Sequence, residues 1–119
     1  MSQNFQPGDF LVFQLEAGFA LLRLLRIDED GSSNVWHVAA YDDFFPDVES
    51  AEQATYEPET LKVSNPHLAL TTRAFESTQV ARIHNVPLTE IDRQALLSWY
   101  ENDAREVSDR SVRLMLGLR

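Results

Sequence analysis

Histidines and carboxylates are the residues of this sequence that could carry acid–base or metal chemistry. The histidines, His37, His67 and His84, are far apart in sequence and form no H-x-x-x-H or H-x-E pattern. Asp42 and Asp43 lie beside aromatic residues that could desolvate a carboxyl group, as general-acid catalysis requires. Adjacent residues of a strand point to opposite faces, so this pair does not easily form a dyad. The alternative function that these residues suggest is that of a small hydrolase or ligand-binding enzyme, with His37, Asp42 and Asp43 in a cleft.

Other catalytic and cofactor-binding patterns are missing from the sequence. The chain has no cysteine, which excludes disulfides, thiol catalysis and cysteine-based metal sites. It has no G-x-S-x-G or S-x-x-K motif and no glycine-rich phosphate loop. The DEDGSS run at 28–33 alternates acids with a glycine, as a calcium loop does, but lacks the other ligand positions. We therefore expect no catalytic residues, no metal and no cofactor.

The segment 40–60, AYDDFFPDVESAEQATYEPET, combines seven carboxylates with four aromatic residues and contains no Lys or Arg. The aromatic side chains could be buried beneath the acids, as aromatic residues usually are. They could instead anchor a binding surface whose acidic rim selects the partner. Both interpretations hold if one phenylalanine points inward and the other outward. The candidate binding residues are Tyr41, Asp42, Asp43, Phe44, Phe45, Asp47, Glu49 and Tyr56.

The charge of the chain is concentrated in its first half. The net charge is −9, and residues 1–60 hold 12 acids but only Arg23 and Arg26 as bases. Such a surface repels phosphate backbones, so we expect no nucleic-acid partner. It attracts a basic protein, because opposite fields steer association. Acidity that serves only solubility is the simpler alternative.

The length of 119 residues and the hydrophobic content of 44% predict one folded domain. No window approaches 18 consecutive apolar residues, so we expect no membrane span. The first ten residues lack the basic start and apolar run of a signal peptide. Together these features predict a cytoplasmic protein of a prokaryote-like cell.

The first forty residues predict a three-stranded antiparallel meander. A turn at 7–9 precedes an alternating strand, and Gly18 suits the positive φ of the next short connection. The second strand is continuously apolar, which indicates burial on both faces, with Arg23 and Arg26 reaching outward. A third strand follows the turn at 28–33. Such short strands are expected to curl into an SH3-like partial barrel.

Residues 42–60 are expected to form an acidic loop or a short helix that has Pro46 at its first position. Two further strands are expected between residues 61 and 84, separated at Asn65-Pro66 and at Glu76-Ser77. Residues 1–87 are therefore predicted to be mostly β.

Residues 88–119 are predicted to be helical. Thr89 with Asp92 forms a variant of the capping box, and apolar residues up to Trp99 and Tyr100 follow with helical spacing. This helix packs on the sheet or forms the seam of a homodimer, so both a monomer and a homodimer are open. Residues 108–118 fit either a strand or a second helix capped by Ser108, and we favour the helix.

The run FQPGDFLVFQLEAGFALLRLLRID resembles the start of small immunity proteins from bacterial polymorphic toxin systems. The matching parts are the Gly8-Asp9 turn, the apolar strand at 10–15, the hairpin turn at 16–18 and the apolar strand at 19–27. The later Pro-Leu-Thr-Glu helix with Trp99 is also similar. The resemblance implies a β-rich, non-enzymatic interaction protein.

The sequence as a whole predicts an α+β domain with about five antiparallel strands and one or two C-terminal helices. Its expected function is that of a non-catalytic protein-binding module, which uses its acidic and aromatic residues against a basic protein.

Overall fold

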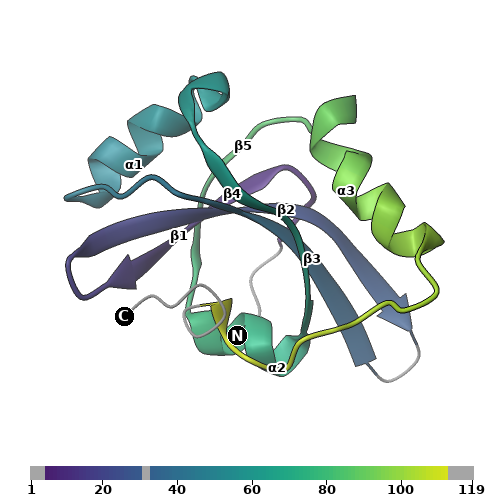
Figure 1. The fold of residues 1–119 in the computed structure, drawn as a ribbon. Helices are drawn as coiled ribbons and strands as arrows, with labels where there is room; N and C mark the ends of the chain where they lie inside the picture. Colours follow the sequence, from purple (N-terminus) through teal and green to yellow (C-terminus); the bar gives the residue numbers. More distant parts are fainter. Residues whose placement is uncertain (1–4, 31–32, 113–119) are drawn as a thin grey trace.

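A computed structural model describes residues 5–30 and 33–112 of the chain. A twisted sheet forms its centre, and helices cover both of its faces (Figure 1). The elements, in chain order, are β1 (Asp9–Leu15), β2 (Gly18–Asp30), β3 (Ser33–Tyr41), α1 (Val48–Thr55), a short 3-10 turn η1 (Pro58–Thr60), β4 (Val63–Thr71), α2 (Thr72–Thr78), β5 (Ala81–Asn85) and α3 (Glu90–Glu101).

The five strands pair antiparallel in the order β4-β3-β2-β1-β5. The predicted α+β class, with a curled antiparallel sheet and a C-terminal helix, is confirmed, and so is the β1–β2–β3 meander. The sheet is open, because β4 and β5 lie at its two edges. The SH3-like comparison therefore stays a prediction.

The central strands are buried on both faces, as the continuous apolar character of β2 predicts. Leu22 and Leu24 of β2 belong to the core cluster beneath α2, together with Phe75. The alternate residues Leu21 and Leu25 face the opposite side, where one cluster lies beneath α1 and another beneath α3. This second face carries the functional candidates described below.

Arg23 corrects one expectation for β2. Its side chain is only 3% exposed, although we expected it to reach outward. Its Nε–H donates to Gly8 O at 3.1 Å, and its Nη2 donates to the carbonyls of Val86 and Pro87 at 2.6 and 3.3 Å. Arg23 is buried because it satisfies backbone carbonyls that would otherwise lack a partner. Arg26 is exposed, as expected.

Gly18 holds the β1–β2 hairpin close to the acidic segment. Its φ is 158°, and a Cβ atom there would lie 2.5 Å from Phe45 O. Phe19 and Phe45 exchange backbone hydrogen bonds at 2.8 and 2.9 Å. The absence of a side chain at Gly18 thus allows the segment after β3 to pair with the start of β2.

Two predicted boundaries are wrong. Helix α1 begins after Asp47, whose side chain accepts from the backbone N of Ser50, so Pro46 precedes the cap instead of opening the helix. Strand β4 runs through Asn65-Pro66, which an edge strand tolerates because its outer N–H groups need no partner.

Residues 72–75, expected to be strand, and Glu76-Ser77, expected to separate two strands, form helix α2 instead. Thr71 ends β4 and caps this helix by accepting from the backbone N of Ala74 at 3.1 Å. The cap outweighs the strand preference of the Thr71-Thr72 pair.

The capping box of Thr89 and Asp92 at the start of α3 is confirmed. The expected cap at Ser108 is wrong, because Ser108 pairs with Leu70 in an isolated parallel bridge. Residues 102–111 form no helix, and residues 113–119 of the ambiguous tail lie outside the described part of the chain.

Candidate functional site

The predicted aromatic residues of the acidic segment divide between the core and the surface. Tyr41, at the end of β3, is buried, and Phe45 packs partly buried against the same cluster beneath α1. Phe44 is 59% exposed and Tyr56, directly after α1, is 61% exposed. One phenylalanine therefore points inward and the other outward, and a role of the exposed side chain in binding stays a prediction.

The predicted carboxylates mostly face solvent. Asp42, Asp47 and Glu49 are exposed, whereas Asp43 is partly buried and accepts from the backbone N of Lys62 at 2.8 Å. Hydrogen bonds from Ser50 lower the pKa of Asp47, which caps α1. Asp43 and Asp47 thus order the segment, while the exposed Asp42 and Glu49 add negative charge to it.

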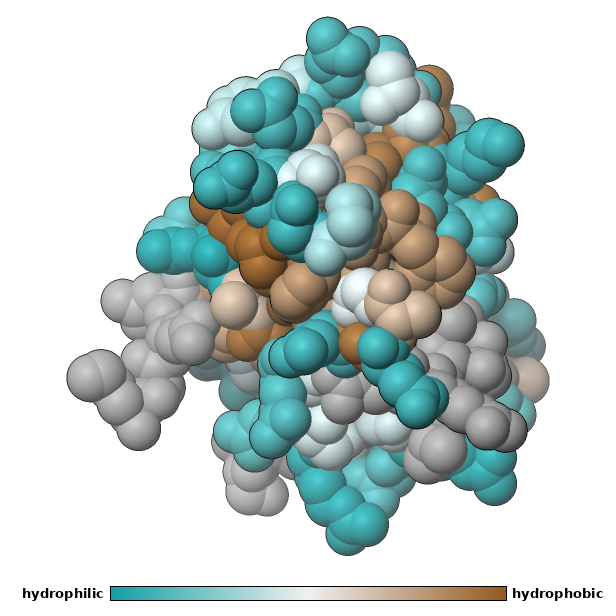
Figure 2. Space-filling model, turned by 90° about the vertical axis from the view of Figure 1, so that its left-hand side faces the viewer, coloured by the Kyte–Doolittle hydropathy of each residue, from teal (hydrophilic) through white to brown (hydrophobic). Residues whose placement is uncertain are grey.

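We define the acidic–aromatic surface by the exposed residues Phe44, Val48 and Tyr56 with Asp42, Asp47 and Glu49. These residues lie on α1 and its flanking connections, at one end of the sheet (Figure 1). Figure 2 shows this side of the molecule, where apolar residues form a band bordered by hydrophilic ones. The Tyr56 ring lies on the ring of His84 from β5, with their centroids 4.4 Å apart.

A second cluster, which the sequence did not reveal, lies beneath α3. It joins Asp28 of β2, His37 of β3 and His67 of β4, and we call it the Asp28–His37–His67 relay. His37 Nε2 lies 2.9 Å from Asp28 Oδ2, and His37 Nδ1 lies 2.8 Å from His67 Nε2. His37 is fully buried between its two partners.

The direction of these hydrogen bonds follows from the charge of Asp28. Burial raises the pKa of Asp28, but hydrogen bonds from Tyr100, His37 and Arg26 outweigh it, so the pKa is lowered. The ionised carboxylate only accepts, so His37 donates to it through Nε2–H. Neutral His37 then accepts at Nδ1 from His67 Nε2–H. His67 is left with an unprotonated Nδ1.

Both histidines are neutral at physiological pH. Burial lowers the pKa of His37, although its hydrogen bond with Asp28 opposes this effect. Burial and the neighbouring His37 lower the pKa of His67 to about 4. The relay therefore holds one negative charge, on Asp28, and two uncharged rings.

Aromatic residues of α3 cover the relay. The Trp99 ring meets His37 edge-on, with centroids 4.8 Å apart, and lies 5.6 Å from the ring of His67. The Tyr100 hydroxyl donates to Asp28, and burial together with this carboxylate raises the pKa of Tyr100 to about 12. Trp99 and Tyr100 thus pack on the sheet of their own chain, which is one of the two arrangements expected for this helix.

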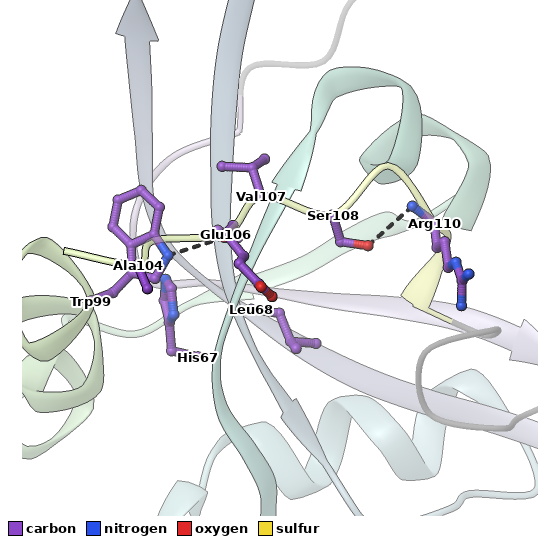
Figure 3. Close-up of a pocket in the computed structure, with 9 residues that line it drawn as sticks. His67, Leu68, Trp99, Ala104, Glu106, Val107, Ser108 and Arg110 are labelled. Atoms are coloured by element: carbon purple, nitrogen blue, oxygen red, sulfur yellow. Dashed lines mark hydrogen bonds between the residues drawn. The ribbon is translucent and has the colours of Figure 1, made fainter. Parts of the chain in front are cut away.

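Two cavities flank Trp99. One, of about 820 Å³, is bounded by β4 and the segment after α3, and His67 lies on its wall (Figure 3). Glu106 O in this segment accepts from Trp99 Nε1–H at 3.1 Å, which fixes the indole at the edge of the cavity. The other cavity, of about 660 Å³, reaches Asp28, Arg26 and Arg105. The two ends of the relay thus face different cavities.

The structure does not bring His37 together with Asp42 and Asp43, as the alternative function required. Both ring nitrogens of His37 are occupied by His67 and Asp28. A carboxylate–histidine pair does exist, but its acid comes from β2. Asp28–Asp30 extend β2 and do not form the expected turn.

Comparison of this chain with protein-family models, with curated proteins and with solved structures finds no match. Among residues 5–30 and 33–112, no group of three or more His, Asp or Glu side chains is arranged to hold a metal ion. No helix within these residues is long and apolar enough to cross a bilayer.

Proposed function

We propose that this protein is a non-catalytic binding module that docks a basic protein on its acidic–aromatic surface. The observation that carries the proposal is the exposure of Phe44 beside the partly buried Phe45. A phenylalanine that is 59% exposed leaves apolar area in water that a partner can bury. Phe45 and Tyr41 anchor the same segment in the core, so Phe44 is presented from a fixed backbone.

The charge of the surface selects the partner. Segment 40–60 holds seven carboxylates and no basic residue, and Asp42, Asp47 and Glu49 are exposed around the apolar residues. A protein with Lys and Arg on its surface would be steered toward this field, whereas nucleic acid would be repelled. Such a rim contributes mostly to the association rate and to specificity.

Aromatic anchors contribute most of the affinity in interfaces of this kind. Phe44 and Tyr56 are such anchors, and Val48 adds apolar area between them along the chain. The resemblance of residues 6–27 to small immunity proteins supports the same class of role, a cytoplasmic bacterial protein that acts by binding another protein. The proposal does not depend on any catalytic group.

The test uses immobilised protein to capture partners from a native lysate at low and at high salt. We expect the wild type to retain a basic protein at low salt and to release it at high salt. The Phe44→Ala variant should lose this protein. The Ile91→Ala variant is the matched control, because Ile91 is a 78% exposed apolar residue on α3, away from the surface.

Three results would contradict the proposal. The first is that no basic protein is retained at low salt. The second is that the retained protein is unaffected by salt, and the third is that Phe44→Ala and Ile91→Ala retain it equally. Thermal unfolding of each variant shows whether a loss of capture reflects a loss of fold.

A further inference from the structure

The 820 Å³ cavity beside Trp99 is lined by both apolar and polar residues. Leu68, Ala69, Trp99, Ala104 and Val107 provide apolar lining, while His67, Ser108, Glu106 and Arg110 provide polar groups (Figure 3). Small-molecule sites commonly combine a mostly apolar lining with a few fixed polar groups. The size of the cavity lies within the range of such sites.

His67 is the polar group of this cavity that the fold holds most firmly. Its Nε2–H donates to His37 Nδ1 at 2.8 Å, and its ring is stacked at 5.1 Å on that of His37. Within residues 5–30 and 33–112, no hydrogen bond to His67 Nδ1 is seen. Nδ1 is therefore an acceptor of fixed orientation on a side chain that lines an accessible cavity.

We propose that this cavity binds a small, flat, phenol-like molecule, whose O–H donates a hydrogen bond to His67 Nδ1 and whose ring packs against Trp99. The proposal does not depend on the acidic–aromatic surface, which lies on α1. An aromatic ring gains contact area from Trp99 and Val107. A hydroxyl group supplies the donor that the unprotonated nitrogen lacks.

The relay explains why a donor of some acidity suits this site. When the ligand O–H shifts its proton toward His67 Nδ1, the proton on His67 Nε2 shifts toward His37 Nδ1. The proton on His37 Nε2 in turn shifts toward the Asp28 carboxylate. The developing positive charge is thereby carried toward a carboxylate. Titratable or charged groups around His67 are His37 on β3, Asp28 on β2, Tyr100 on α3, and Glu106 and Arg110 after α3.

The direct test compares ligands of nearly the same shape with and without the donor. Calorimetry or fluorescence of Trp99 would measure the affinity of para-nitrophenol, para-cresol and para-nitroanisole, at a pH where both phenols are protonated. We expect para-nitrophenol to bind best, para-cresol next and para-nitroanisole worst. One neutral hydrogen bond corresponds to a preference of about fivefold for para-nitrophenol over its methyl ether.

The variant His67→Phe keeps a ring on the cavity wall but removes the acceptor, so it should abolish this preference. Leu97→Ala is the control, because Leu97 is exposed on α3 and is not among the residues that line the cavity. Nitrogen-15 spectra of wild-type His67 give a measurement that does not rely on any variant. Addition of para-nitrophenol should shift the Nδ1 resonance and leave His84 unchanged.

The proposal is overturned if para-nitroanisole binds as tightly as para-nitrophenol, or if neither ligand binds. It is equally overturned if the His67 Nδ1 resonance does not respond to para-nitrophenol. The failure of this test leaves the docking of a basic protein untouched, because the two tests use different ligands and different residues.

Discussion

Single residues beneath α3 decide the protonation of the relay. Asp28 accepts from His37, Tyr100 and Arg26, and this concentration of donors keeps it ionised inside the fold. His37 and His67 are then held neutral by burial, each with a defined tautomer. A buried polar network of this kind contributes to stability only while all of its members keep their partners.

The pH dependence of stability follows from His67. Its pKa falls from 6.5 in the unfolded chain to about 4 in the fold, because burial and His37 disfavour the charged ring. Between these two pKa values the unfolded state binds more protons than the folded state, so the free energy of unfolding rises with pH. It therefore decreases as the pH is lowered from 6.5 toward 4. Chemical denaturation at several pH values should show that the free energy of unfolding decreases by on the order of 1–2 kcal/mol over this range. This figure is discounted for the partial exposure of the His67 ring.

His67→Phe is the control for this dependence. The variant carries no titrating group at this position, so its free energy of unfolding should vary less than that of the wild type over the same range. An equal slope for both proteins would show that His67 is not responsible.

Arg23 gives a second prediction at this scale. We expect Arg23→Lys to lower the free energy of unfolding by about 2–4 kcal/mol, because an ammonium cannot reach the carbonyls of Gly8, Val86 and Pro87 together. Arg73→Lys is the control, since its side chain is exposed and its pair with Asp109 spans 3.6 Å in solvent. Urea unfolding of both variants measures the difference, and equal losses would contradict the role of Arg23.

Among the elements, β2 determines where the relay forms. Its pairing with β3 shifts register between Leu24 and Arg26, so Leu25 and Arg26 both belong to the α3 side. Arg26 then lies opposite His37 in the ladder, and Asp28 follows on the same face. Without this register shift, the strict alternation of side chains along β2 would place Asp28 on the face of the sheet that α2 covers.

Helix α2 contains a backbone conformation that a substitution can improve. Gln79, at its C-cap, has a φ of 57°, in the left-handed region that glycine adopts without strain. Gln79→Gly should therefore raise the free energy of unfolding by about 0.5–1 kcal/mol. Gln94→Gly, within α3, should lower it by about 1 kcal/mol. Thermal unfolding distinguishes them, and a loss at both positions would contradict the cap.

The sequence predicts those elements whose signals are local. The hairpin of β1 and β2, the two-sided burial of β2 and the capping box of α3 all follow from neighbouring residues. Helix α2 was missed because its Thr71 cap follows a strand without a break. The relay was missed because its members come from three strands, and their meeting depends on the register shift in β2. Phe44 and Phe45 could not be told apart, because their difference depends on the approach of Phe19.

At the scale of the whole molecule, the two proposed sites are well separated. The acidic–aromatic surface lies on α1, and the relay with its cavity lies beneath and beside α3, at the other end of the sheet (Figure 1). Variants of one site should therefore leave the other intact. A homodimer through α3 stays a prediction, and it would have to use the exposed Ile91 and Leu97, because Trp99 and Tyr100 pack on His37.

The docking of a basic protein on the acidic–aromatic surface is tested most directly by the dissociation constant of the captured partner. Calorimetry would compare the wild type, Phe44→Ala and Ile91→Ala at low and at high salt. We expect Phe44→Ala to weaken binding by tenfold or more, about 1.4 kcal/mol. High salt should weaken binding of the wild type, and Ile91→Ala should have no effect. A dissociation constant that changes neither with salt nor with Phe44→Ala would contradict the proposed function.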